Sequence, residues 1–263
     1  MKIGFIGTGV MGNAMIGHLM NSGFEVNIYT RTKAKADNLV KDGAIWQESP
    51  KEVAKNSDVV ITIVGYPSDV EEVYFGKESI IEGIKEGSIV VDMTTSTPKL
   101  AKRIYDEFKK INVASIDAPV SGGDVGAKNA TLTIMCGGDQ EAFDKLDKVF
   151  SAMGKTIVLQ GPAGSGQHTK MCNQIALAGS MLGMVEYIKY AQVNGLDPEK
   201  VLESIGMGSA GSTAINVYTP RIFKGDYAPG FYIKHYVKDL KIAIDVMKEE
   251  NEELEGLNLV YKL

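Results

Sequence analysis

Three polar side chains stand in a largely apolar stretch near residue 170, spaced as they would be on one face of a helix. Lys170, Asn173 and Gln174 follow the glycine-rich entry Gly164-Ser165-Gly166, and spacings of three and four residues share a helical face. Burying a lysine costs free energy, so a buried lysine usually has a functional role. Burial also lowers the pKa of an ammonium group toward the range useful for proton transfer. We predict that Lys170 is a catalytic acid and base facing a cleft between two domains. The alternative is a surface lysine whose stem lies along the helix.

A second segment, Asp117 to Gly123, combines a small hydroxyl group with consecutive glycines directly after an expected strand. Such a loop presents backbone N–H groups in a concave array that suits a carboxylate, with a serine as a further donor. An ordinary turn is the alternative. We predict that Ser121, Gly122 and Gly123 bind the carboxylate of a small substrate.

The amino terminus carries a third motif, because Gly7-Thr8-Gly9-Val10-Met11-Gly12 matches GxGxxG. The pattern alone is weak, but here it follows an expected strand and opens a helix at the start of a βαβ unit. In that context glycine allows a tight turn, close approach to a pyrophosphate and helix–strand packing, while the helix N-terminus supplies N–H donors. We predict that a dinucleotide lies against Gly7, Gly9, Val10, Met11 and Gly12.

The end of the second expected strand indicates which dinucleotide. A site that prefers NAD places an acid there to bind both ribose hydroxyls, whereas this strand ends in Thr30-Arg31-Thr32-Lys33. A guanidinium group pairs well with phosphate, and no carboxylate is there to repel it. We therefore expect NADP(H) to be preferred, held by Arg31 and Thr32, with NAD(H) possible. A solvated basic turn is the alternative.

The elements that would position these motifs alternate between strand and helix in the first part of the chain. This favours βαβ units and a mostly parallel sheet, an α/β Rossmann fold. We expect strands at 3–6, 25–29, 59–64, 88–92, 113–116, 131–135 and 156–158, and helices at 14–21, 33–41, 51–55, 99–110 and 141–152.

The pattern changes at the breaker cluster Gln160 to Gly164, after which no strand signal is seen. We place a domain boundary there, with a Rossmann dinucleotide-binding domain at 1–163 and an all-α substrate and dimerisation domain at 164–263. A long interdomain helix begins the second domain. Its apolar stripe is expected to comprise Met171, Ile175, Ala178, Leu182, Val185 and Ile188.

Composition excludes several classes of protein. The net charge of −5 is spread along 263 residues without a basic run, so nucleic acid is not an expected partner. No segment resembles a signal peptide or a membrane span, which predicts a cytoplasmic protein without a membrane partner. Cys136 and Cys172 lack metal or disulfide spacing and are expected to be buried thiols, and three scattered histidines predict no metal site.

Together, these motifs make the chain resemble the β-hydroxyacid dehydrogenases, a family that includes 3-hydroxyisobutyrate dehydrogenase and tartronate semialdehyde reductase. The match is collinear over nearly the whole chain, and several motifs in order are more specific than any one. It rests on Gly7 to Gly12 followed by Asn13-Ala14-Met15, on Asp92-Met93-Thr94-Thr95 with Pro98, on Asp117 to Gly123, on Gly164 to Gln174, and on Lys238-Asp239-Leu240.

The resemblance implies roles for individual residues. Lys170 matches the family's catalytic lysine, and Asn173 matches the polar neighbour that orients substrate. Val64 and Thr95 are expected near the nicotinamide half of the cofactor, and Lys238 is expected to face both cofactor and substrate. The family also implies a homodimer or homotetramer, and a substrate that is a small hydroxy acid or its semialdehyde.

The chain departs from the family pattern at two places, and three alternative functions stay open. Some relatives have asparagine where this chain has Gln174, and the chain ends at Leu263 before the tail that usually closes the helical domain, as in a truncated chain. A 6-phosphogluconate dehydrogenase-like protein would carry a long carboxyl-terminal extension and a His-Asn pair after the lysine. An imine reductase-like protein typically replaces Lys170. A non-catalytic NADP-binding protein is the third alternative.

Overall fold

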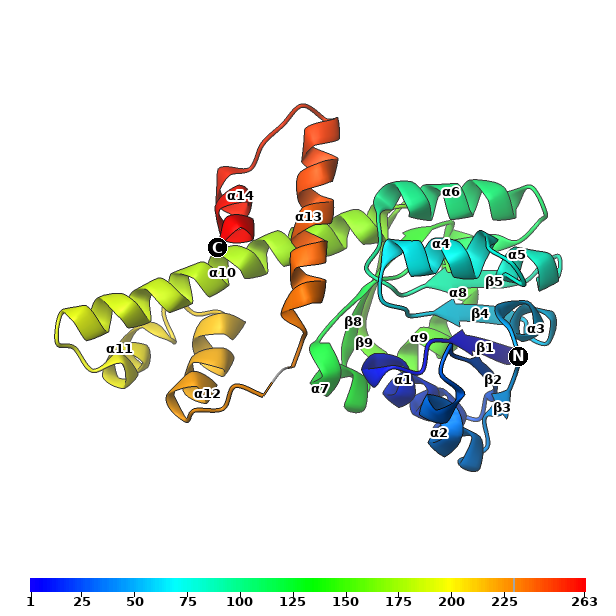
Figure 1. Ribbon diagram of the computed structural model, residues 1–263, viewed down its shortest axis with the longest axis horizontal. Helices are drawn as coiled ribbons and strands as arrows, with labels where there is room; N and C mark the ends of the chain where they lie inside the picture. Colours follow the sequence, from blue (N-terminus) through cyan, green and yellow to red (C-terminus); the bar gives the residue numbers. More distant parts are fainter. Residues whose placement is uncertain (229) are drawn as a thin grey trace. The chain divides into compact units, whose positions relative to one another are not determined.

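The computed structural model describes residues 1–228 and 230–263 and divides the chain into two compact units, Met1–Lys170 and Met171–Leu263 (Figure 1). The first unit is built on a β-sheet, and every regular element described in the second is a helix. This confirms the predicted α/β class, with a Rossmann domain followed by a helical domain. The division falls inside α10, Ser165–Val193, whose 29 residues begin just after the predicted boundary.

The sheet of the first unit has nine strands in the order β3-β2-β1-β4-β5-β6-β8-β7, and β9 pairs with β8. The run from β3 to β6 is parallel, whereas β8 is antiparallel to both β6 and β7. The strand order reverses between β1 and β4, the place where doubly wound sheets bind ligands at their carboxyl ends. The strands are β1 Lys2–Ile6, β2 Glu25–Tyr29, β3 Ile45–Trp46, β4 Val59–Thr62, β5 Ile89–Asp92, β6 Ala114–Asp117, β7 Val120–Ser121, β8 Leu132–Gly138 and β9 Gly154–Gly161.

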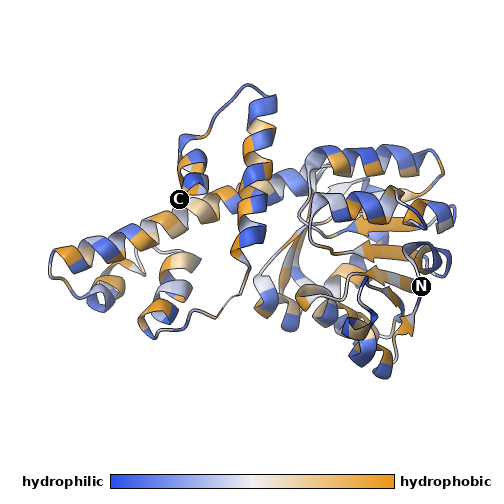
Figure 2. Cartoon of the chain, viewed as in Figure 1, coloured by the Kyte–Doolittle hydropathy of each residue, from blue (hydrophilic) through white to orange (hydrophobic). Residues whose placement is uncertain are grey.

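Helices pack on both faces of this sheet, and two apolar cores result. Val59 and Ile61 of β4 belong to one core and Val60 to the other, as alternation along a strand requires. Because central parallel strands are buried on both sides, they are continuously apolar, as the orange strands of Figure 2 show. One core takes side chains from α1 Val10–Asn21, η1 Lys33–Ala36, α2 Asp37–Lys41, α7 Gly123–Lys128, α8 Gln140–Lys145 and α9 Asp147–Ser151, and the other from α3 Pro50–Lys55, α4 Pro67–Phe75, α5 Ile80–Gly83 and α6 Pro98–Lys109.

Local capping explains where two of these helices begin. The Ser49 side chain accepts a hydrogen bond from the Glu52 amide before α3, and Thr97 does the same before α6. A proline occupies the first helical position of each, where its missing N–H has no intrahelical partner to lose. Both helices therefore start one residue before the predicted 51–55 and 99–110.

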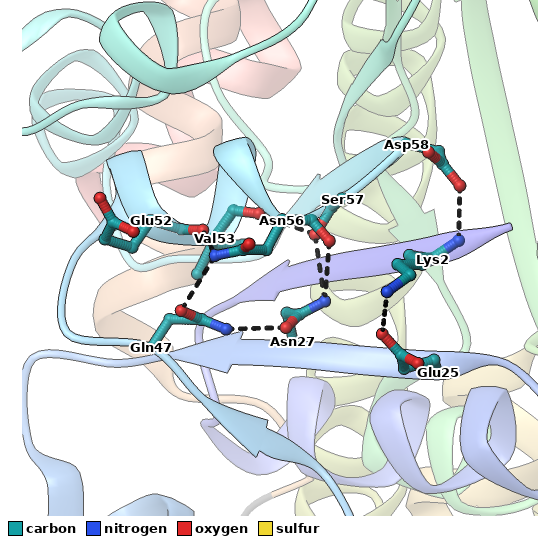
Figure 3. Close-up of polar contacts among 9 residues, drawn as sticks. All are labelled: Lys2, Glu25, Asn27, Gln47, Glu52, Val53, Asn56, Ser57 and Asp58. Carbon is teal, nitrogen blue, oxygen red and sulfur yellow. Dashed lines mark hydrogen bonds and ion pairs between the residues drawn. The ribbon is translucent and has the colours of Figure 1, made fainter.

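A polar network ties the β2–β3 edge of the sheet to α3 (Figure 3). Buried Asn27 donates from Nδ2 to the Asn56 carbonyl oxygen at 3.1 Å and accepts from Gln47 Nε2 at 2.8 Å. Asn56 in turn donates to Gln47 Oε1 at 3.3 Å. These polar groups satisfy one another, so this network stabilises the fold.

Three expectations about the first unit differ from the structure. The single helix expected at 141–152 is two helices, α8 and α9, because Leu146 leaves the helical conformation with ψ near 1° and is buried in the core. The short strand β3 and the helices α4, α5 and α7 were not predicted. The segment expected as a loop at Asp117 to Gly123 contains the two-residue strand β7, which is too short to show a period of two.

The second unit packs its helices into two small cores along α10. One joins α10 to α13 and α14, and the other joins α10 to α11, η2 and α12. Most of the predicted apolar stripe packs in these cores, but Val185 is 55% exposed, so its assignment was wrong. No helix in the described ranges is long and apolar enough to cross a membrane. The further helices are α11 Pro198–Ile205, the π-helical turn η2 Ala214–Tyr218, α12 Thr219–Phe223, α13 Ile233–Glu249 and α14 Glu255–Lys262.

Candidate active site

The glycine loop after β1 contains two glycines that the fold itself requires. Gly7 has a φ of 107°, and a Cβ there would lie 2.1 Å from the Ile63 carbonyl oxygen. A Cβ on Gly12 would lie 1.9 Å from the Gly7 carbonyl oxygen. Gly9 differs, because its φ is −72° and no atom lies within 4 Å of where its Cβ would be. The chain alone therefore gives no reason for glycine at position 9.

This loop fits the pyrophosphate of a dinucleotide. Helix α1 begins at Val10 and continues through Met11, so its first-turn N–H groups lie directly after Gly9, which caps the helix without a side chain. Thr8 Oγ1 is buried and has no hydrogen-bond partner among the described residues. Backbone donors at a helix N-terminus, an approach left open by Gly9 and a spare hydroxyl together suit a phosphate group.

Beyond the end of β2, Arg31 is 71% exposed and forms an ion pair with Asp69, with 3.0 Å between Nη1 and Oδ1. Asp69 lies in the first turn of α4 and also accepts the Tyr66 amide at 3.0 Å. Neighbouring Lys33 pairs instead with Glu48. A guanidinium has five N–H donors, so one ion pair leaves capacity for a phosphate. Thr32 is exposed beside Arg31.

The loops that follow β4 and β5 are hydrogen-bonded to each other. The Val64 amide donates to Thr94 Oγ1, and the Thr94 amide donates to Asp92 Oδ1, both at 3.0 Å. Asp92 also accepts from Thr62 Oγ1 at 2.8 Å. Burial raises the pKa of Asp92 to about 6, an effect these hydrogen bonds partly oppose. Val64 and Thr95, both predicted to lie near the nicotinamide, are thus on loops held together.

Asp117 at the end of β6 caps the start of α10. Its Oδ1 accepts from the Gly164 amide at 2.7 Å and its Oδ2 accepts from the Gln167 amide at 2.8 Å. Burial raises the pKa of Asp117 to about 6, while these amides favour its charged form. A Cβ at Gly137 would lie 2.6 Å from Oδ1, so glycine makes room for the carboxylate. The first turn of α10 is therefore fixed to the sheet.

One and a half turns into α10, Lys170 is only 7% exposed, and its Nζ donates to the Val120 carbonyl oxygen at 2.8 Å. Val120 directly precedes the predicted carboxylate loop. There Ser121 is half-buried, and Gly122 and Gly123 have φ values of 123° and 62° that favour glycine. The structure thus brings together the predicted proton donor and the predicted carboxylate loop within the first unit.

In the second unit, a chain of polar contacts joins α10 to α13. Asn173 donates to Gln174 Oε1 at 2.8 Å, and Gln174 Nε2 donates to Asp239 Oδ2 at 2.7 Å. The other oxygen of buried Asp239 lies 3.0 Å from Lys238 Nζ. Tyr236 donates to the Gln174 carbonyl oxygen at 3.1 Å. Gln174 thus links the two residues predicted to bind substrate in this unit.

For three residues of these networks, no role was predicted from the sequence. Asp117 and Gln167 lie inside recognised motifs, and Asp239 follows Lys238, but each acts through contacts distant in sequence. A signal was available for Gln167, which stands three residues before Lys170 and therefore shares its helical face. The acid at the end of an expected strand was a weaker signal for Asp117.

The expectation that both cysteines are buried was wrong for one of them. Cys136 is buried in β8, and burial raises the pKa of its thiol to about 12. Cys172 is exposed, because the helical turn that buries Met171 directs the next residue outward. Within the described part of the chain, no three His, Cys, Asp or Glu side chains are grouped as metal ligands would be.

Two protein-family models divide the chain between them. Residues 2–161 match the NAD binding domain of 6-phosphogluconate dehydrogenase, and residues 164–263 match a domain described as NAD-binding of NADP-dependent 3-hydroxyisobutyrate dehydrogenase. The first match alone covers more than half of the chain.

Curated relatives extend over the same length. A protein of Arabidopsis thaliana named probable 3-hydroxyisobutyrate dehydrogenase-like 1 is 49% identical over all of this chain and 78% of its own length. The chain belongs to the β-hydroxyacid dehydrogenase family. Another relative, an uncharacterized oxidoreductase of Bacillus subtilis, is 54% identical over 99% of this chain and 91% of its own length.

A solved member of the family has the same fold. The 3-hydroxyisobutyrate dehydrogenase of Mycobacterium tuberculosis, solved with L-serine, superposes with a TM-score of 0.93 at 26% identity, covering 99% of this chain and 91% of that one. Membership makes this chain an oxidoreductase of the β-hydroxyacid dehydrogenase family, and its first unit an NAD(P)-binding domain.

Proposed function

We propose that the protein interconverts a small hydroxy acid and its semialdehyde with NADP(H), using Lys170 to move the proton. The observation that carries this proposal is the position of Lys170, whose ammonium group is buried against the Val120 carbonyl oxygen at the entry to the Ser121-Gly122-Gly123 loop. A proton donor and a set of carboxylate-binding N–H groups are the two parts that such a reaction requires of the protein.

The cofactor, when its pyrophosphate lies at the glycine loop, supplies or takes the hydride through its nicotinamide. The chain's own residues do the rest. The Ser121 hydroxyl and the Gly122 and Gly123 amides hold the substrate carboxylate, which fixes the distance of the carbonyl carbon from Lys170. In the direction of reduction, the Lys170 ammonium gives a proton to the developing alkoxide oxygen. In oxidation, the neutral amine takes the hydroxyl proton.

The carboxyl-terminal match favours this reaction over the alternatives. It is to a 3-hydroxyisobutyrate dehydrogenase domain, whereas the 6-phosphogluconate dehydrogenase match is confined to the dinucleotide-binding unit. Lys170 is present where imine-reducing relatives typically differ. Because the solved Mycobacterium tuberculosis member carries L-serine, serine is a second candidate substrate of the same chemical class.

A substrate panel tests the proposal. We expect turnover with 3-hydroxyisobutyrate, tartronate semialdehyde or L-serine, each assayed with NADP(H) and NAD(H) in both directions. Substrates that differ by a methyl or hydroxyl group are distinguished by about 1 to 3 kcal/mol in an enzyme pocket. One candidate should therefore have a kcat/KM at least about tenfold above the others. An imine or 6-phosphogluconate as the sole substrate would contradict the proposal.

Replacing Arg31 with alanine is expected to raise the KM for NADPH about tenfold to a hundredfold, the worth of a hydrogen bond to a charged group. The reason is loss of the guanidinium proposed to hold the 2′-phosphate. The KM for NADH should stay within a factor of about two, because NADH has no such phosphate. Initial rates at varied concentrations of each cofactor measure both values.

Lys33→Ala is the matched control. It removes the same charge two residues along the chain from Arg31, and the Lys33 side chain is already paired with Glu48. We expect it to change neither KM by more than about twofold, as for other exposed charges. Equal effects of Arg31→Ala on both cofactors, or a wild-type preference for NADH, would reject the NADP assignment.

Replacing Gly122 with valine is expected to raise the KM for the acid substrate or lower turnover by about tenfold or more, while NADPH affinity is nearly unchanged. A side chain blocks close approach of a carboxylate to the backbone. The change also strains the backbone, because φ is 123°, at a cost of about 1 to 2 kcal/mol in stability. Steady-state kinetics and NADPH fluorescence titration measure the two effects.

Gly87→Val separates strain from function. Gly87 has a φ of 80° with nothing within 4 Å of its Cβ position, and it lies in the turn before β5. We expect a similar loss of thermal stability without a change in substrate KM. If both variants retained wild-type kinetics, the Ser121-Gly122-Gly123 loop would be a structural turn only.

Other expectations from the sequence stay predictions. They are the homodimeric or homotetrameric state, the absence of a nucleic-acid or membrane partner, the cytoplasmic location, and the substrate-binding roles of Asn173 and Lys238. Light scattering during size-exclusion chromatography would measure the first.

A further inference from the structure

Gln167 is completely buried, and both polar atoms of its side chain bind the backbone of one loop. Nε2 donates to the Thr94 carbonyl oxygen at 2.8 Å, and Oε1 accepts from the Ser96 amide at 2.9 Å. The amide therefore spans the two residues that flank Thr95. All of these atoms belong to the first unit.

The helix itself does not require this side chain. Asp117 already accepts the Gly164 and Gln167 amides at the start of α10, so the helix end is capped without it. Burying a glutamine fixes several rotatable bonds and removes two polar atoms from water, a cost recovered here only through the loop. The role of Gln167 therefore concerns the loop after β5.

Gln167 lies between that loop, which it binds, and Lys170, which is on the same helix. Gln167 and Lys170 are one helical turn apart on the same face of α10. The loop also contacts the turn after β4, because Thr94 Oγ1 accepts from the Val64 amide. Gln167 therefore joins this loop directly to the helical turn that carries Lys170.

We propose that Gln167 is a positioning residue that couples occupancy of the cofactor site at Thr94–Ser96 to the placement of the Lys170 ammonium group. The inference rests on the proposed function, which places the nicotinamide half beside Thr95 and gives Lys170 the proton transfer. One amide then sets the separation between the cofactor-binding loop and the proton donor.

Competitive labelling with acetic anhydride tests the coupling without any turnover. The rate of Lys170 acetylation, measured by mass spectrometry of its peptide, is compared with and without saturating NADP⁺ over a range of pH. In the wild type we expect NADP⁺ to change this rate at least about threefold, a modest coupling. In Gln167→Met, which keeps the size of the side chain but neither hydrogen bond, the ratio should lie clearly closer to one than in the wild type, because only direct shielding by the cofactor remains.

Gln47→Met is the matched control. Its amide also forms two hydrogen bonds within the first unit, to Asn27 and Asn56 at the β2–β3 edge (Figure 3). We expect it to lower thermal stability while the NADP⁺ effect on Lys170 stays as in the wild type. A purely structural Gln167 would behave in the same way as Gln47.

Gln167→Glu keeps the test decisive if the methionine variant does not fold. A protonated glutamic acid is shaped like glutamine and can donate to the Thr94 carbonyl oxygen, whereas the carboxylate cannot. NADP⁺ affinity is compared with that of wild type at each pH, because Asp92 and Asp117, which accept the Thr94 and Gln167 amides, have pKa values of about 6 in every variant. Relative to wild type, the affinity of Gln167→Glu should rise as pH falls, with no such rise in Gln47→Glu. A pH-independent affinity equal to that of wild type would overturn the proposal.

Different results would contradict the coupling through Gln167 and the proposed substrate class. If NADP⁺ leaves Lys170 labelling unchanged in the wild type, or changes it equally in wild type and Gln167→Met, the coupling through Gln167 is wrong. If the coupling is observed but no hydroxy acid or semialdehyde is turned over, the coupling stands and the proposed substrate class is wrong.

Discussion

Gly9→Ala is expected to leave the cofactor-free protein as stable as the wild type while weakening NADP(H) binding about a hundredfold. Stability should be spared because Gly9 has a φ that any residue adopts and no atom within 4 Å of its Cβ position. Affinity should fall because a methyl group stands where the pyrophosphate approaches the backbone, and each charge-assisted hydrogen bond lost costs about 1.5 to 3 kcal/mol. NADPH fluorescence titration and thermal unfolding without cofactor measure the two quantities.

Two other glycines of the same segment are controls. Gly17→Ala adds a methyl group to open space later in α1 and should change neither quantity by much. Gly12→Ala places a Cβ 1.9 Å from the Gly7 carbonyl oxygen and should destabilise the cofactor-free protein itself. If Gly9→Ala bound NADPH within about threefold of wild type, the loop would not contact a pyrophosphate as proposed.

Local sequence patterns were sufficient to predict the architecture. The GxGxxG segment from Gly7 to Gly12, the alternation of strand and helix, and the change at Gln160 to Gly164 each depend on neighbouring residues, and the structure has the Rossmann sheet and helical second unit they indicate. The spacing of Lys170, Asn173 and Gln174 was read from helical geometry, and α10 contains all three.

The contacts of the candidate site could not be predicted in the same way. Gln167 binds Thr94 and Ser96 more than seventy residues earlier in the chain. The loop after β5 lies beside Asp117, which holds the start of α10, because β5 and β6 are parallel neighbours in the sheet. The pairing of Arg31 with Asp69 depends likewise on β2 and β4 flanking β1. A single sequence carries no local signal for such pairs.

The solvent exposure of individual side chains along α10 was also predicted incorrectly in part. Cys172 and Val185 were assigned to the interior because their neighbours are apolar, yet both are exposed. A helix 29 residues long that packs against different helices at its two ends buries different faces along its length. One stripe at constant spacing therefore describes only part of it.

Lys170→Ala is expected to lower the turnover number by about 10² to 10⁴, the usual worth of a positioned proton donor. The variant should still bind NADPH, since the glycine loop is not altered. The change also leaves the buried Val120 carbonyl oxygen without the hydrogen bond that Nζ donates, so stability should fall by about 1 to 3 kcal/mol. Thermal unfolding, NADPH titration and steady-state kinetics separate these three effects.

Two further variants distinguish loss of the proton from loss of packing. Lys170→Met keeps most of the apolar stem but not the ammonium group, so it should recover stability without recovering turnover. Lys170→Arg keeps the charge but cannot release its proton near neutral pH, so it should also fail. Small primary amines added to Lys170→Ala should restore part of the rate, because they supply the missing acid and base. Retention of more than about a tenth of wild-type turnover in Lys170→Ala would move proton transfer elsewhere, with Lys238 as the next candidate.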